Sequence, residues 1–300
     1  MAKIAVALDQ ALEARRRAGE LGVTTPNVLA RGEGWSVADV VCTAGPADRP
    51  FEEAHACATI AVVVAGSFTY ASSTGRALMT PGAMMLGNRG HCYTCGHEHG
   101  AGDRCVSFWY GPEVFERVLA DAGIRVRRDA FTAARLPPLR ELAPLVANTA
   151  RGLLTPDAAA WEELSVTLAA RVVGLAGGPT RTVPTPLNAE ARVTDVVRAI
   201  DHDIDAASDA SLTLADLAQR ARLSPYHFLR TFEQVTGVTP HQYILRTRLR
   251  QAAILLAMEP GRVLDIAFET GFGDLSNFNR TFRAEFGVSP RVYRRSGGPP

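Results

Sequence analysis

The chain has 300 residues, of which 47% are hydrophobic and 21% are charged, and its formal net charge is +1 at pH 7. This length and apolar content fit two folded domains and exclude a disordered or fibrous protein. No apolar run reaches eighteen residues and the first 22 residues carry charges throughout, so we expect neither a signal peptide nor a membrane span, and a cytoplasmic location. The five cysteines, an odd number, favour free thiols over a disulfide framework.

The N-terminal part of the chain predicts one amphipathic helix, over residues 1–21, followed by a series of strands. Short β-rich runs punctuated by glycine and proline predict strands between about residues 27 and 110, among them 37–42, 59–64 and 106–110. The P-G-x-x-x-L pattern from Pro81 to Leu86 and the order of the strands resemble a cupin. That resemblance implies a small jelly-roll barrel that serves as a sensor domain.

Cysteine and histidine are concentrated between residues 91 and 105, where three cysteines, three histidines and two carboxylates occur within fifteen residues. Upstream, His55 and Cys57 are two residues apart, so both side chains lie on one face if this segment is a strand, and Cys95, His97 and His99 would likewise share a face. Thiolate with imidazole favours zinc, copper or iron over magnesium or calcium. The candidate metal ligands are therefore His55, Cys57, His91, Cys92, Cys95, His97, His99 and Cys105.

Other interpretations of these residues stay open. Cupin metal sites use an H-x-H strand and a further histidine after the P-G turn, and His55, Cys57 and His91 occupy roughly those places, but the glutamate of that pattern is missing. The cysteines could be buried and inert with the histidines exposed in a loop. They could also form a thiol sensor that reacts with oxidants or electrophiles.

Helices follow the predicted strands. Residues 112–119 predict a helix that leaves the barrel, and apolar residues at three- and four-residue spacing predict two more over Leu139–Leu153 and Pro156–Leu175. Thr155 would cap the last of these, with Pro156 at its first position. Residues 177–186 contain three prolines and no periodicity. We therefore expect a sensor domain over 1–176, a linker over 177–189 and a second domain over 190–300.

The last third of the chain contains one pattern twice. The following residues each recur fifty positions later: Phe228, Arg230, Thr231, Phe232, Gly237, Pro240 and Tyr243. Each copy predicts a short helix, a tight turn and a second helix, because Ser224 and Asp274 are favourable N-caps and Gly237 and Gly287 suit helix C-termini. Two short helices joined in this way form a helix-turn-helix unit. The alternative is a hairpin used only for packing, but the repeat keeps an arginine as well as the core phenylalanines.

The second helix of each unit has a predicted core face and a predicted outer face. Phe228 and Phe232 are four residues apart and should both face the core, as should Phe278 and Phe282. The outer positions, which we predict to contact DNA, are Tyr226, His227, Leu229 and Arg230 in the first unit and Ser276, Asn277, Asn279 and Arg280 in the second. Arginine can bind guanine and asparagine can bind adenine with two hydrogen bonds, and residues near the start of a recognition helix reach base edges.

Residues 212–294 resemble the DNA-binding domain of the AraC/XylS transcription regulators. The resemblance rests on both copies and their spacing, and on the A-x-x-x-G-F-x-D/E-x-S-x-F-x-R-x-F-K/R run at 267–283 with G-x-S-P at 287–290. It implies two units joined by a long helix, at about 240–258, that insert into successive major grooves. The base-facing positions that it implies are Tyr226, Leu229 and Arg230, and then Ser276, Asn277 and Arg280. It also implies promoter DNA and RNA polymerase as partners, a homodimer formed through the helical hairpin, and an activator with no enzymatic activity.

Charge is unevenly distributed along the chain. Residues 210–300 contain twelve arginines and seven acidic residues, whereas 190–209 contain six acidic residues and two arginines. The acidic helix should therefore face away from phosphate or contact the other domain. Candidate phosphate contacts are Arg246, Arg248, Arg250, Arg291, Arg294 and Arg295.

The sequence thus predicts an α+β protein with an N-terminal cupin-like β-barrel and helical hairpin, and an all-α C-terminal domain with two helix-turn-helix units. We expect a DNA-binding transcription regulator whose barrel senses a metal, a redox signal or a small molecule. One rival is a cupin-type metalloenzyme that performs oxygen chemistry. Another is a DNA-binding repressor with no effector.

Overall fold

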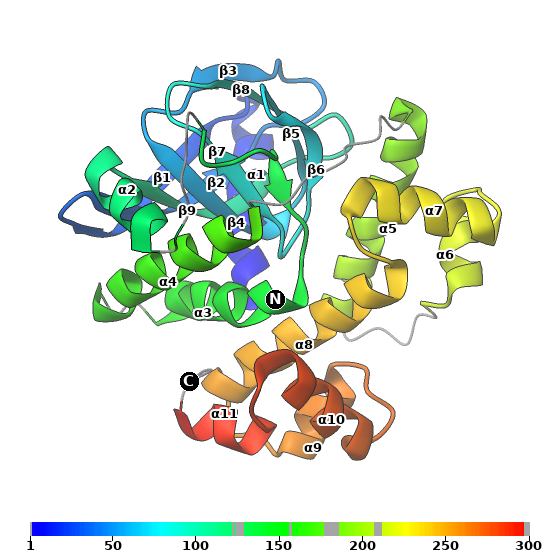
Figure 1. The fold of residues 1–300 in the computed structure, drawn as a ribbon. Helices are drawn as coiled ribbons and strands as arrows, with labels where there is room; N and C mark the ends of the chain where they lie inside the picture. The colour runs from blue at the N-terminus through cyan, green and yellow to red at the C-terminus, as the bar shows by residue number, and fades with distance from the viewer. Residues whose placement is uncertain are drawn as a thin grey trace.

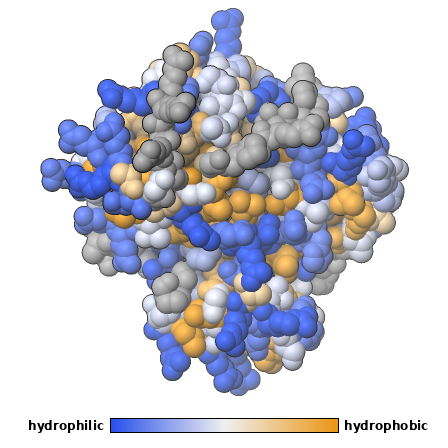
Figure 2. Space-filling view, viewed as in Figure 1, coloured by the Kyte–Doolittle hydropathy of each residue, from blue (hydrophilic) through white to orange (hydrophobic). Residues whose placement is uncertain are grey.

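A computed structural model describes residues 2–121, 123, 129–155, 158–176, 186–206 and 212–296. The described chain has a strand-rich part with helices on one side, followed by a helical part (Figure 1). Hydrophilic residues cover most of the rim of the face in Figure 2, and hydrophobic ones gather near its centre. None of the described helices is long and apolar enough to cross a membrane.

The larger of two antiparallel sheets has six strands. In spatial order they are β1 (Thr24–Gly32), β2 (Trp35–Cys42), β9 (Asp103–Tyr110), β4 (Ala58–Gly66), β7 (Met84–Gly87) and β10 (Arg135–Leu136). The central strand β4 is rich in valine and almost entirely buried, because both faces of the sheet are covered. The predicted strands at 37–42, 59–64 and 106–110 lie within β2, β4 and β9 and are confirmed.

The smaller sheet has four strands and lies against one face of the larger one. Its spatial order is β3 (Phe51–Ala54), β8 (Cys92–Gly96), β5 (Phe68–Ser72) and β6 (Gly75–Met79). A core lies between the sheets, where Val63 of β4 and Cys105 of β9 pack with Phe68 and Tyr70 of β5 and Cys95 of β8. The sequence predicts a closed barrel, but among the described strands the two sheets stay separate.

Helices cover the other face of the larger sheet. They are α1 (Ala2–Ala18), α2 (Pro112–Asp121), the 3-10 turn η1 (Arg140–Leu142), α3 (Ala143–Leu154) and α4 (Ala158–Ala176). Trp161 and Leu168 of α4 pack there with Ile60 of β4 and Phe108 of β9. The N-terminal helix and the helical pair are confirmed, but Thr155 is the C-cap of α3, and Pro156 lies outside the described residues.

The helical part contains seven helices in the described residues. They are α5 (Leu187–Asp205), α6 (Leu214–Arg220), α7 (Pro225–Thr236), α8 (Pro240–Met258), α9 (Val263–Glu269), α10 (Leu275–Phe286) and α11 (Pro290–Ser296). Most of the predicted linker, 177–185, lies outside the described residues, and α5 begins within the remainder.

Candidate nucleic-acid interface

The first helix-turn-helix unit is formed by α6 and α7. Ser224 caps α7 by accepting a hydrogen bond from the His227 amide at 3.4 Å, and Pro225 occupies the first turn, where a missing N–H costs nothing. The helix ends at Gly237, whose φ of 82° is a left-handed conformation that glycine adopts without strain. Both predicted ends of the helix are confirmed.

The second unit, formed by α9 and α10, repeats this construction. Asp274 caps α10 by accepting a hydrogen bond from the Asn277 amide at 2.7 Å. The helix ends at Gly287, with a φ of 77°. The fifty-residue repeat in the sequence therefore corresponds to a repeat in local structure.

Aromatic packing also repeats between the two units. Phe232 contacts Tyr243 edge-on at a ring-centroid distance of 5.9 Å, and Phe282 contacts Tyr293 edge-on at 5.3 Å. Phe228 and Phe278 are fully buried beside them, as predicted. Aromatic pairs of this kind fix each recognition helix on its support, since they add stabilisation beyond that of buried area alone.

The predicted DNA-contact residues are mostly exposed on the two recognition helices. Tyr226, His227 and Arg230 are exposed on α7, and Tyr226 is 75% exposed although it is aromatic. The four predicted residues of α10, which are Ser276, Asn277, Asn279 and Arg280, are also exposed. The side chain of Arg280 donates a hydrogen bond to Asn277 Oδ1 at 3.1 Å, so the two groups that could read bases lie side by side.

Leu229 differs from the other predicted contact residues. It is half-buried and lines a hollow of about 610 Å³ with Leu217 of α6 and Ile244 and Arg248 of α8. Only part of this side chain is therefore available to a ligand outside the helix.

The helix α8 joins the two units. It has 19 residues and begins with a capping box formed by Thr239 and Gln242. A helix of this length spans about 28 Å, close to the roughly 34 Å of one DNA helical turn. One continuous helix therefore sets the separation between the two recognition helices.

Two of the arginines predicted to contact phosphate are engaged within the protein. Arg250 is 3% exposed and donates to Thr247 Oγ1 at 2.8 Å. Arg246 donates to the Pro138 carbonyl at 2.8 Å and lies 3.5 Å from a Glu285 carboxylate oxygen. The prediction is therefore wrong for Arg250, because burial beside the core of the first unit removes it from any surface.

A family model described as a helix-turn-helix domain matches residues 217–296, which include both units. The Tn10 TetD protein of Escherichia coli is 38% identical to the chain over 104 residues, which cover 35% of this chain and 72% of TetD. The chain belongs to the AraC family of DNA-binding transcription regulators. The predicted family is thus confirmed.

Longer relatives match over a smaller share of their length. The transcriptional regulator MtrA of Neisseria gonorrhoeae is 35% identical over 78 residues, which are 26% of either chain. The right origin-binding protein of Escherichia coli K12 is 36% identical over 88 residues, 29% of this chain and 30% of that protein. This AraC-family chain therefore spans less than a third of these two proteins.

Two solved structures match part of the chain. A regulator from Chromobacterium violaceum described as AraC-type is 26% identical and covers 38% of this chain and 99% of its own, with a TM-score of 0.34. The DNA-binding domain of AdpA, solved with a target DNA, is 28% identical and covers 35% of this chain and 91% of its own, with a TM-score of 0.33. These TM-scores are too low to establish a shared overall fold, so the family assignment rests on the sequence matches.

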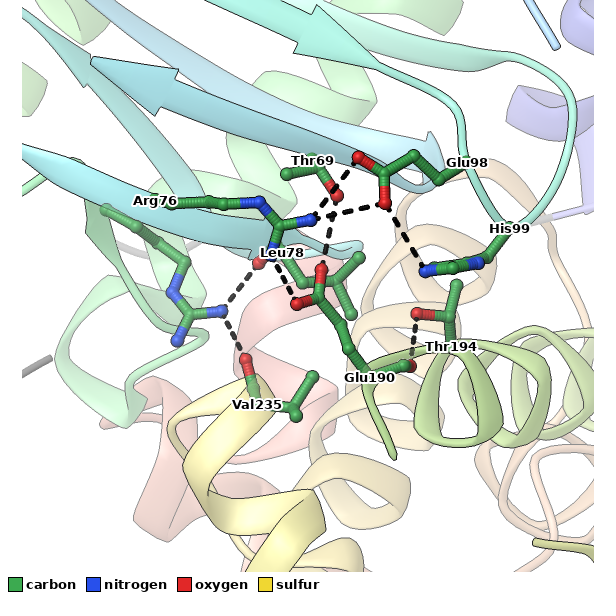
Figure 3. Close-up of polar contacts among 9 residues, drawn as sticks. Thr69, Arg76, Leu78, Glu98, His99, Glu190, Thr194 and Val235 are labelled. Carbon is green, nitrogen blue, oxygen red and sulfur yellow. Dashed lines mark hydrogen bonds and ion pairs between the residues drawn. The ribbon is translucent and has the colours of Figure 1, made fainter. Parts of the chain in front are cut away.

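The acidic helix α5 contacts the smaller sheet of this AraC-family protein. Figure 3 shows Arg76 of β6 between Glu98 and Glu190, with Glu190 reaching from α5. Thr69 of β5 donates a hydrogen bond to the same Glu190 carboxylate at 3.2 Å. Glu190 is only 4% exposed, so the acidic helix does contact the other part of the chain, which was one of the two predicted alternatives.

A short segment before α3 contacts both helix-turn-helix units. Arg135 of β10 donates to the carbonyl of Val235, at the end of α7, at 2.8 Å. Arg140 of η1 donates to the carbonyl of Ala284, near the end of α10. Cations are favourable at helix C-termini, where carbonyl groups lack partners within the helix. The strand-rich part thus holds the far end of each recognition helix.

The predicted metal ligands do not converge at one place. His55 is buried, with Nε2 2.8 Å from the Tyr70 hydroxyl and its ring stacked on Tyr93, and burial together with His91 lowers the pKa of His55 to about 4. His91 lies 2.9 Å from Asp129, and His99 lies 3.7 Å from Glu98. Cys57 is half-buried and Cys92 is exposed.

Residues 55–57 do not form a strand, so the condition under which His55 and Cys57 would share a face is not met. They connect β3 of the smaller sheet to β4 of the larger one, with a bend at 56–57. His97 and His99 follow β8, which ends at Gly96, so the prediction that they share a strand face with Cys95 is wrong.

A different set of side chains lies close together. Cys42, His97 and Asp103 are all buried, and one potential ligand atom of each lies within 4.8 Å of those of the other two. Of the eight predicted ligands, only His97 belongs to this group. Cys42 and Asp103 were missed because they are far apart in sequence, although they are direct partners in the register of β2 and β9.

Proposed function

We propose that this chain binds promoter DNA in a sequence-specific way by placing α7 and α10 in successive major grooves. The observation that carries the proposal is the duplicated unit, with the same caps, the same aromatic core and an exposed polar outer face on each recognition helix. The 19-residue helix α8 separates the two by roughly one turn of DNA.

The exposed residues suit particular roles in this complex. Arg280 and Arg230 can each bind a guanine with two hydrogen bonds, and Asn277 or Asn279 can bind adenine. Tyr226, His227 and Ser276 can contact bases or phosphates near the helix starts. The half-buried Leu229 offers at most an apolar contact, such as one to a thymine methyl group.

In our proposal the strand-rich part is the sensor, and the protein activates transcription. The proposal includes RNA polymerase as a partner and a homodimer formed through α3 and α4. What supports a sensing role is the set of contacts from β6, β10 and η1 to α5, α7 and α10. A signal that alters these contacts changes the affinity for DNA. The change is limited by the difference in the signal's own affinity for the DNA-bound and DNA-free arrangements of the protein.

Selection of binding sites from random duplex DNA with the full chain tests this function. The expected result is a bipartite site with half-sites about 10 base pairs apart. The variant Arg280→Ala should lose about 1–3 kcal/mol of specific binding and lose its preference at one base position.

Arg283→Ala is the matched control, because Arg283 is exposed on the same helix and carries the same charge. The Arg283→Ala variant should weaken binding by a similar factor for all DNA sequences and should leave base preference intact. Selection of no common sequence, or an Arg280→Ala variant with unchanged affinity and preference, would contradict the proposal.

A further inference from the structure

Three strands bring Cys42, His97 and Asp103 to one buried point between the two sheets. Cys42 ends β2 and pairs directly with Asp103, which begins β9. His97 follows the end of β8 in the smaller sheet. The group therefore forms only when the sheets are packed together.

The local geometry is compact and polar in an otherwise apolar core. His97 Nε2 lies 2.7 Å from Asp103 Oδ1, and the Cys105 thiol donates to Asp103 Oδ2 at 3.2 Å. Cys95, two residues before His97, is also buried, and all five cysteines are free thiols. Cys105 and Cys95 thus place two further sulfur atoms beside the group.

The two ring nitrogens of His97 have different surroundings. The His97 side chain is 1% exposed, and its Nδ1 is buried without a hydrogen-bond partner among the described residues. A buried polar atom without a hydrogen-bond partner destabilises the folded protein. In metal-binding histidines one ring nitrogen commonly binds the metal, and the other donates a hydrogen bond to a carboxylate. His97 fits this pattern, because Nε2 lies beside Asp103 and Nδ1 remains available to a metal.

The geometry points to a zinc-ion site formed by His97 and Cys42, with Asp103 as a third ligand or as the carboxylate that orients His97, and with Cys105 beside it. Nitrogen, sulfur and oxygen donors at zinc sit about 2.0–2.3 Å from the ion. Donor atoms spaced within 4.8 Å of one another can surround one ion after shifts of about 1 Å.

The segment that carries this site also touches the first helix of the DNA-binding part. Residues 97–103 include Glu98, which reaches Arg76 and through it Glu190 of α5 (Figure 3). A Cβ atom at Gly100 would lie 1.9 Å from the guanidinium carbon of Arg198, another α5 residue, so the two are in close contact. Arg198 also donates to Ser67 Oγ at 3.0 Å.

Zinc binding therefore orders a segment on which α5 rests, and it changes how firmly the DNA-binding part is held. This coupling rests on the proposed function, whereas the zinc site itself does not. The two are separated by measuring metal binding without DNA.

The test uses cobalt(II) and zinc(II) chlorides added to the tag-free full chain, purified under reducing, anaerobic conditions and freed of metal. We expect one cobalt per chain with a near-ultraviolet thiolate-to-cobalt band that zinc abolishes. Cys42→Ser should weaken zinc binding at least 10-fold and reduce the band, and His97→Gln should weaken it about 10–100-fold. Circular dichroism checks that each variant is folded.

Cys92→Ser is the matched control, because Cys92 is an exposed cysteine at the start of β8, the strand that precedes His97. It should bind cobalt as the unchanged chain does. Absence of stoichiometric cobalt or zinc in the unchanged chain overturns the site, and so does a thiolate band that Cys92→Ser removes and Cys42→Ser leaves intact. DNA affinity that rises or falls with zinc in the unchanged chain but not in Cys42→Ser supports the coupling, and equal responses overturn it.

Discussion

Single groups removed from solvent decide several properties of this protein, and Asp201 of α5 is one whose pKa is strongly shifted. The Tyr243 hydroxyl donates to both of its carboxylate oxygens, at 3.1 and 2.9 Å. Burial raises the pKa of Asp201 to about 7, although Arg250 and the Tyr243 hydrogen bond act in the opposite direction. Asp205 and Arg198 are the other charged groups near it, and they have opposite effects.

This arrangement predicts a pH-dependent stability of the first helix-turn-helix unit. Between the unfolded pKa of 3.8 and about 7, the folded chain binds a proton that the unfolded chain has lost, so stability falls as pH rises through this window. Asp201→Asn keeps an acceptor for Tyr243 but cannot ionise. Relative to the variant, the unchanged chain should lose on the order of 2–4 kcal/mol between pH 4.5 and 8 by urea denaturation.

Asp195→Asn is the control for this measurement, because Asp195 is exposed on the same helix. Its stability difference from the unchanged chain should vary little with pH. A difference between the unchanged chain and Asp201→Asn that stays constant across the range would contradict the assignment.

At the residue scale, helical periodicity predicts the outward-facing side chains of α7 and α10 but not the buried group of Cys42, His97 and Asp103. The positions of Phe228 and Phe278 in the repeat fix which side chains face outward, so the exposure of Arg230 and Arg280 follows from the sequence. Leu229 departs from the pattern because α6 and α8 close over it. Cys42 and Asp103 lie together because they are partners in the register of β2 and β9. The concentration of cysteines and histidines between residues 91 and 105 does not predict that pairing.

The recognition helices both end at a left-handed glycine, and the two sites differ in their surroundings. A Cβ at Gly237 would lie 2.6 Å from the Pro137 Cβ, whereas one at Gly287 would meet nothing within 4 Å. The first helix therefore ends with its last glycine against the segment that leads from β10, whereas the space beside Gly287 at the end of the second helix is open.

Substituting each glycine by alanine should separate the free-energy cost of a positive φ from the cost of steric contact with Pro137. Gly287→Ala should cost about 1–2 kcal/mol through its positive φ alone. Gly237→Ala should cost roughly 1–3 kcal/mol more, because Pro137 must also move. Denaturant unfolding measures both, with the exposed Gly261→Ala as a control expected to change stability by about 0.5 kcal/mol or less. Equal losses at the two sites would show that Pro137 does not constrain α7.

At the scale of elements, helices and strands that are marked by nearby residues are predictable from the sequence. The assignment of strands to sheets is not, because it depends on pairing between distant segments. The caps Ser224 and Asp274 locate the recognition helices, and runs of β-branched and aromatic residues locate β2, β4 and β9. Strand composition does not show which sheet a strand joins. For this reason a single closed barrel was expected where the described strands form two sheets.

At the scale of the whole molecule, polar contacts join the strand-rich part to the helical part. Arg76 forms an ion pair with Glu190 of α5, in which the Glu190 side chain is only 6% exposed and the Arg76 side chain is 36% exposed. Arg135 is partly buried near Glu190, and burial lowers the pKa of Arg135 to about 10 although Glu190 acts to raise it. These contacts hold α5 and α7 against β5 and β6.

Neutralising Glu190 should loosen this junction. Glu190→Gln keeps an acceptor for Thr69 but loses the charge opposite Arg76, so we expect a loss of about 1–2 kcal/mol and faster hydrogen exchange in β6 and α5. Glu98→Gln is the control, because Glu98 is 43% exposed and its oxygens lie 3.3–3.4 Å from the same arginine. It should change stability by less than about 0.5 kcal/mol. Equal effects of the two variants would contradict a buried interdomain link.

The central claim is that two helix-turn-helix units on one rigid helix bind DNA together, and half-site spacing tests it most directly. Affinity is measured for the selected site and for the same site with five base pairs inserted between its halves. The inserted half-turn places the second half-site on the opposite face, where α8 cannot deliver α10, so affinity should fall at least about tenfold. Affinity that is unchanged by the insertion would mean that the units do not bind together, and the account would fail.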